Sequence, residues 1–69
     1  MTQKDIDNLL NSVNALMMEN HKIAKKLKLF FNILTGGKTD DIYEANEYIK
    51  THIPGEYSDF IDFLKDCLD

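Results

Sequence analysis

An apolar pattern that repeats every seven residues dominates the first half of the chain and most constrains its fold. Two sets of positions, offset by three residues, carry the repeat. They are Ile6, Val13, Asn20, Leu27 and Leu34, and then Leu9, Leu16, Ile23 and Phe30. This is the a and d spacing of a helical heptad over four repeats, with Asn20 as the one polar exception. It predicts one unbroken helix from about residue 2 to residue 34.

The apolar stripe is wider than the seam of a two-stranded coiled coil. A further apolar residue adjoins it in each heptad, at Leu10, Met17, Ala24 and Phe31. A stripe three residues wide is typical of a bundle helix that contacts more than one neighbour. Thr2 and Asp5 predict the helix start, because the hydroxyl accepts a first-turn N–H and the acid lies near the positive helix end.

Turn residues divide the second half into two shorter predicted helices. Gly36 and Gly37 directly follow the last heptad position and predict a helix end. Asp41, with Glu44 at capping-box spacing, predicts the start of a helix that Pro54 ends. A third helix covers about residues 55–68. We therefore predict an all-α fold in a single domain, 1–69, with one long N-terminal helix and two short helices.

The small size of the chain favours oligomerisation. A chain of 69 residues buries only about 60% of its unfolded surface, and with Cys67 as the only cysteine it forms no internal disulfide. Leu29 and Ile33 lie on the side of the predicted rod opposite the heptad stripe, so its end is apolar nearly all round. We predict that a homodimer completes the bundle. The predicted interface comprises Ile6, Leu9, Val13, Leu16, Asn20, Leu29 and Ile33.

Asn20 has two interpretations within the predicted rod. A single buried Asn at an a position fixes the register and oligomeric state of helical assemblies. Alternatively, the side chain lies partly in solvent at the edge of a wide bundle. Both interpretations place Asn20 inside a continuous helix.

The residues that carry chemistry do not form a catalytic pattern. Gly36-Gly37-Lys38-Thr39 resembles the end of a phosphate-binding loop, but position 32 is Asn and no strand precedes it. His21 and His52 have no further ligand at metal-binding spacing, and Cys67 has no histidine partner nearby in the sequence. We therefore expect no enzymatic activity, no cofactor and no bound metal.

Charge is distributed unevenly along the chain. Residues 1–38 hold six Lys and three acids, a net charge of +3, whereas residues 39–69 hold two Lys and nine acids, a net charge of −7; together they give −4. Lys22, Lys25 and Lys26 cluster opposite the heptad stripe and provide an alternative function, the binding of nucleic acid or another anionic ligand. Nucleic acid is disfavoured, because the chain has no Arg and no aromatic residue lies among these lysines.

The main functional hypothesis is a non-enzymatic regulatory or inhibitory protein that binds an unidentified protein partner. The predicted contact residues are Leu10, Met17 and Met18 on the first helix, and Asp59, Asp62, Phe63 and Asp66 on the third. Met suits adaptable binding surfaces. An acidic stripe by itself is typical of a solvated helix face, and for Phe63 we favour an interface role over packing at the core edge. A third hypothesis is a structural coiled-coil adaptor.

Localisation is predicted from what the sequence does not contain. No apolar run follows a basic start, as a secretory signal requires, and no run of 18 or more apolar residues exists. A lone cysteine fits a reducing compartment. We expect a cytoplasmic protein without membrane contact. Frequent Lys, Asn and Ile are typical of AT-rich genomes and compatible with a phage or mobile-element gene.

Overall fold

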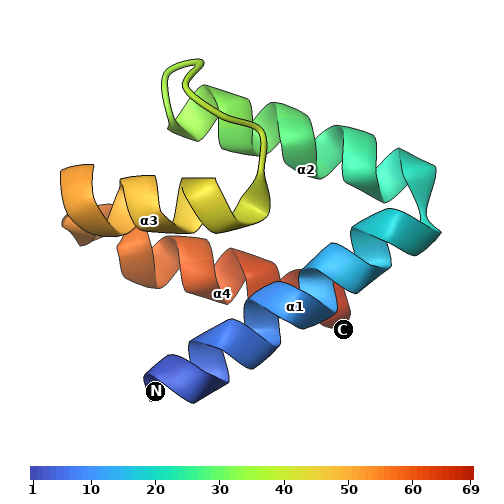
Figure 1. Ribbon diagram of the computed structural model, residues 1–69, viewed down its shortest axis with the longest axis horizontal. Coiled ribbons are helices and arrows are strands. Elements are labelled where there is room, and N and C mark those ends of the chain that lie inside the picture. Colours follow the sequence, from blue (N-terminus) through green and yellow to red (C-terminus); the bar gives the residue numbers. More distant parts are fainter.

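Four α-helices and one short 3-10 turn make up the fold. The computed structural model describes residues 1–69. Its helices are α1 (Gln3–Glu19), α2 (His21–Leu34), α3 (Ile42–His52) and α4 (Tyr57–Leu68), and the turn η1 (Pro54–Glu56) joins α3 to α4 (Figure 1). The predicted all-α class is confirmed. None of the helices is both long enough and apolar enough to cross a membrane.

The prediction of one long N-terminal helix is wrong, because the chain turns at Asn20. This residue has an extended backbone (φ −128°, ψ 102°), and its side-chain oxygen accepts hydrogen bonds from the N–H groups of Lys22 (3.1 Å) and Ile23 (3.2 Å). Asn is among the strongest N-cap residues. Asn20 therefore ends α1 and starts α2 from an exposed position, a role that neither interpretation within a rod included.

Local signals that the sequence displays do set three other helix ends, the start of α1, the end of α2 and the start of α3. The Asp5 N–H donates to the Thr2 hydroxyl (3.2 Å) and the Thr2 N–H donates to the Asp5 carboxylate (3.0 Å). The Thr2 backbone N–H, and then its side chain, lower the pKa of the Asp5 carboxyl. Asp41 caps α3 through the Glu44 N–H (3.0 Å). Gly36, with a φ of 65°, begins the left-handed turn that follows α2.

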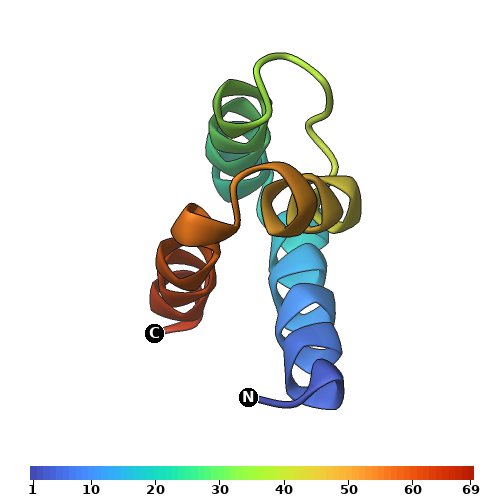
Figure 2. The same cartoon turned by 90° about the vertical axis from the view of Figure 1, so that its left-hand side faces the viewer.

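The four helices share one hydrophobic core. Figure 2 shows α2 and α4 on one side and α1 and α3 on the other. The buried residues between them are Leu9, Leu10, Val13, Met17, Ala24, Leu27, Phe31, Ile42, Ala45, Ile49, Phe60, Ile61 and Leu64. Seven of these thirteen belong to the widened heptad stripe. Because the chain bends at Asn20, one protomer covers most of the stripe that we assigned to a dimer.

Candidate interaction surface

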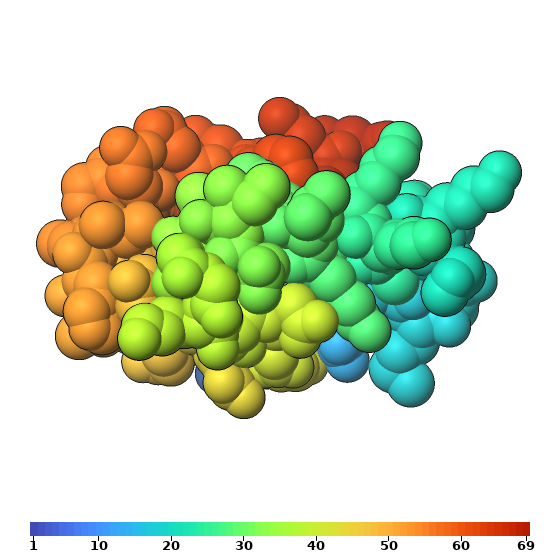
Figure 3. Space-filling model, turned by 90° about the horizontal axis from the view of Figure 1, so that it is seen from above, coloured from blue at the N-terminus to red at the C-terminus, as the bar shows by residue number.

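The outer side of α2 carries apolar residues that the rest of the protomer leaves uncovered. Leu29 is 63% exposed and Ile33 is 68% exposed. They are four residues apart, so they lie on the same side of the helix. Figure 3 views the molecule from the side on which α2 lies. The apolar surface that we predicted opposite the heptad stripe therefore exists on α2. The continuous helix from residue 2 to residue 34 on which we had placed it does not.

Three lysines adjoin this apolar pair. Lys22, Lys25 and Lys26 line one shallow depression together with Leu29. The whole of α2 holds four lysines and no carboxylate. Cations in the first turns of a helix face the positive end of its dipole, which disfavours them. The lysine cluster therefore does not stabilise α2. We call Lys22, Lys25, Lys26, Leu29 and Ile33 the α2 face.

A groove separates α2 from α4. The two helices run in opposite directions (Figure 1), and no Cα atom of one lies within 8 Å of a Cα atom of the other. Aromatic side chains bridge the gap: the ring centroids of Phe30 and Phe63 are 4.2 Å apart, and those of Phe31 and Phe60 are 5.9 Å apart. One end of this α2–α4 groove is lined by Ile23, Lys26, Leu27, Phe63 and Cys67.

The two helices that border the groove carry opposite charges. Lys26 belongs both to the groove and to the lysine depression beside it. Along α4, Asp59, Asp62 and Asp66 are all exposed, and their spacing of three and four residues places them along one side of that helix. We call these three residues the acidic edge. The groove thus lies between a basic helix and an acidic one: Asp59 lines a hollow with Phe30 and Phe60, whereas Asp62 lines a hollow on the α1 side of α4.

The residues of the predicted dimer interface separate into two groups. Leu9 and Val13 are buried in the protomer core, and Ile6 and Leu16 are half-buried. These four face their own protomer because the bend at Asn20 lets α1 pack against both α2 and α4. Asn20 is an exposed cap, as described above. Of the predicted set, only Leu29 and Ile33 leave a substantial apolar surface for a second molecule.

The predicted partner-binding residues are also divided by the fold. Leu10 and Met17 are buried, whereas Met18 is 81% exposed at the end of α1. Phe63 is half-buried against Phe30, so it packs at the edge of the core rather than standing free as an anchor.

Cys67 and the buried polar side chains are held in the packed interior or at its edge. Cys67 lines the α2–α4 groove, and burial, reinforced by the nearby Asp66 carboxylate, raises the pKa of its thiol. The Tyr57 hydroxyl donates to the buried Asn46 side chain (2.7 Å). No buried side-chain polar atom lacks a hydrogen-bond partner. These groups are accounted for by packing alone.

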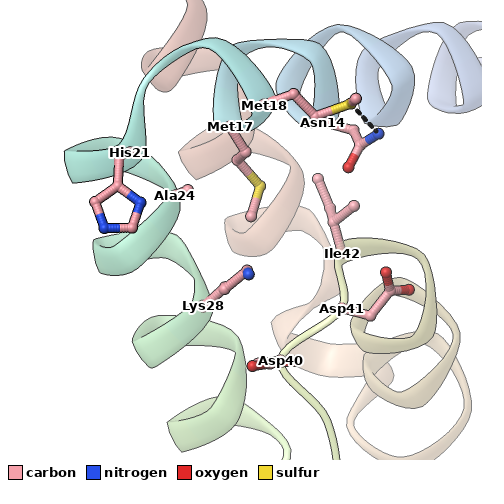
Figure 4. A pocket seen from close by; sticks show the side chains of 9 residues that line it. All are labelled: Asn14, Met17, Met18, His21, Ala24, Lys28, Asp40, Asp41 and Ile42. Atoms are coloured by element: carbon pink, nitrogen blue, oxygen red, sulfur yellow. Dashed lines mark hydrogen bonds between the residues drawn. The ribbon is translucent and has the colours of Figure 1, made fainter.

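A second hollow, which the sequence did not suggest, lies at the junction of α1, α2 and the segment before α3. Its nine lining residues are Asn14, Met17, Met18, His21, Ala24, Lys28, Asp40, Asp41 and Ile42 (Figure 4). Lys28 comes from α2, and Asp40 and Asp41 come from the segment before α3. His, Cys, Asp and Glu side chains nowhere gather in threes that could hold a metal ion. The hollow places opposite charges near each other but brings no nucleophile beside a base.

Comparisons of the chain with protein-family models, with curated proteins and with solved structures gave no match. An inference about function therefore depends on the surface itself. The feature of that surface that differs most from an ordinary solvated helix is the α2 face together with the groove beside it.

Proposed function

We propose that this protein is a non-enzymatic regulatory or inhibitory protein that acts by binding another protein through the α2 face. The observation that carries the proposal is the exposure of Leu29 and Ile33 on the same side of one helix. Apolar surface in contact with water costs about 25 cal/mol per Å² relative to burial. The protomer contains a formed core of thirteen buried residues and leaves this pair outside it.

The chemistry around the pair fits a protein contact. Interfaces between proteins combine an apolar centre with a polar border. Leu29 and Ile33 provide the centre, and the lysines of the α2 face provide one border with aliphatic stems that can lie along an apolar partner. The half-buried Phe30 and Phe63 extend the apolar area into the groove.

Photocrosslinking tests this proposal. A photoreactive amino acid at position 29 is expected to form a covalent adduct with a protein when the chain is expressed in its native host. The matched control carries the same group at Asn8, an exposed position on α1, and is expected to form far fewer adducts. Equal labelling from both positions, or none from position 29, would contradict the proposal. The adduct mass separates a second copy from a different protein.

A second candidate function, the binding of an anionic ligand, is supported by the shared depression of Lys22, Lys25 and Lys26. Three phosphate contacts predict that the logarithm of the DNA affinity falls with the logarithm of the salt concentration, with a slope of about −2.7. The measurement is a fluorescence-anisotropy titration of a labelled DNA duplex across salt concentrations. Absence of binding at low salt, or a flat salt response, would eliminate this candidate.

A further inference from the structure

We propose that the α2–α4 groove receives α2 of a second copy of this chain, which makes the protein a two-fold dimer. In this dimer the α2 face of each copy lies beside the acidic edge of the other. The inference rests on the proposed function, because it names the partner of the same surface. Three observations support it: the complementary charge of the two edges, the directions of the two helices, and the dimensions of the molecule.

Charge complementarity identifies a second copy as the occupant. The α2 face contributes Lys22, Lys25 and Lys26 from a helix without carboxylates, and α4 contributes three aspartates against the single cation Lys65. A ligand for the α2 face must be acidic and must tolerate apolar contacts. Helix α4 has both properties, because it carries three exposed aspartates and one of them, Asp59, lines a hollow with Phe30 and Phe60. The chain therefore carries the complement of its own α2 face.

The antiparallel course of α2 and α4 determines how two copies can meet. Ile23 lines the same end of the groove as Cys67, and Phe30 contacts Phe63 further along. A two-fold axis parallel to the groove brings each residue of the second copy to the same position along the groove direction as in the first copy. It therefore places Leu29 of one copy level with Phe63 of the other, and Lys25 level with Asp66. The two α2 helices are neighbours under either axis, but only the parallel axis also sets Lys25 beside α4 of the other copy, so charge favours the parallel axis.

The molecule is large enough for such a contact. Its extents are 29 × 28 × 16 Å, and a standard protein interface covers about 800 Å² on each partner. The 14 residues of α2 form a rod of about 21 Å, which matches the length of a groove bordered by the 12 residues of α4. Seating Leu29 and Ile33 in this channel removes from water the apolar surface that the protomer leaves exposed.

The test reverses the charges of each edge separately. The basic-edge variant carries Lys22→Glu, Lys25→Glu and Lys26→Glu, and the acidic-edge variant carries Asp59→Lys, Asp62→Lys and Asp66→Lys. Sedimentation velocity is expected to give the wild type twice its monomer mass of 8.0 kDa. Each variant alone is expected to sediment as a monomer. An equimolar mixture of the two is expected to recover the dimer mass, because each α2 then faces an α4 of opposite charge.

A matched control separates the specific contact from the effect of net charge. Lys4, Lys38 and Lys50 are exposed and lie outside the α2 face. Replacing these three by Glu changes the net charge by the same amount as the basic-edge variant, and this control is expected to remain a dimer. The reversals in α2 are not expected to unfold the protein, because Lys22→Glu puts a carboxylate at the positive end of that helix. Circular dichroism should show an unchanged helix content for the basic-edge variant, with a melting temperature lowered only by the loss of the stabilisation that dimerisation gives the wild type.

Three results would overturn the inference: a monomeric wild type at submillimolar concentration, a mixture that stays monomeric, or loss of the dimer in the matched control. The proposed function fails on different data. If position 29 crosslinks to another protein while the wild type is monomeric, the α2 face binds a different acidic partner and only the dimer is wrong. If position 29 forms no adduct at all, the proposed function fails as well.

Discussion

Replacement of Asn20 by leucine is expected to join α1 and α2 into one straight helix. The change removes the side-chain oxygen that accepts hydrogen bonds from the N–H groups of Lys22 and Ile23. Loss of an N-cap of this kind costs about 0.5–2 kcal/mol. Leucine also has a high helix propensity and completes the heptad pattern at its one polar position. Both effects favour a helical backbone at residue 20 and disfavour the bend.

A distance measurement between two spin labels reports the outcome. Labels at the exposed Asn8 and Asn32 are separated by 24 residues, which corresponds to about 36 Å along a continuous helix. This separation is greater than the longest extent of the native fold, 29 Å. A straight helix also exposes Val13 and Phe31, so the variant is expected to associate through its opened core.

A conservative pair of variants controls this experiment. Asn20→Asp and Asn20→Ser keep an N-cap oxygen and are expected to retain the wild-type distance. If Asn20→Leu also retains that distance and loses little stability, tertiary packing rather than the cap determines the bend.

Phe31→Ala is expected to give the largest loss of stability of any single truncation in α2. Phe31 has no exposed surface, and its ring packs 5.9 Å from that of Phe60, centroid to centroid. Truncation of a buried Phe to Ala costs about 3–5 kcal/mol. A chain of 69 residues has a total stability of about 3–10 kcal/mol, so this single change removes a large part of it.

Urea titration followed by circular dichroism measures this loss. The control is Asn32→Ala on the same helix, which is expected to change the free energy of unfolding by no more than about 0.5 kcal/mol because Asn32 is exposed and lies outside the α2 face. A loss below about 1 kcal/mol for Phe31→Ala would mean that the core repacks around the missing ring.

The helix ends that were predicted correctly depend on local signals. The capping box of Thr2 and Asp5, the Asp41 cap and the glycines after α2 all act within a few residues of the end that they define. Their physical effects are therefore readable from short windows of sequence. The bend at Asn20 also uses a local cap, but the heptad pattern around it concealed the signal. That pattern is the same whether the stripe lies on one straight helix or on two helices that face a shared core.

The candidate surface was predicted only in part. The sequence showed that Leu29 and Ile33 lie opposite the stripe, and the structure leaves both exposed. The groove was not predicted, because it depends on the separation of α2 from α4 by aromatic side chains from both helices. The placement of Phe63 at the core edge depends on the same contact.

The sequence by itself determined an all-α chain, its caps, its apolar stripe and the unequal charge of its two halves, because each follows from residue type and from spacing along a helix. Only the tertiary structure decided which parts of the stripe are covered within one protomer and which residues remain exposed. The physical reason is that burial depends on contacts between segments far apart in sequence. A single bend at Asn20 changed those contacts for Ile6, Leu9, Val13 and Leu16 and left Leu29 and Ile33 exposed.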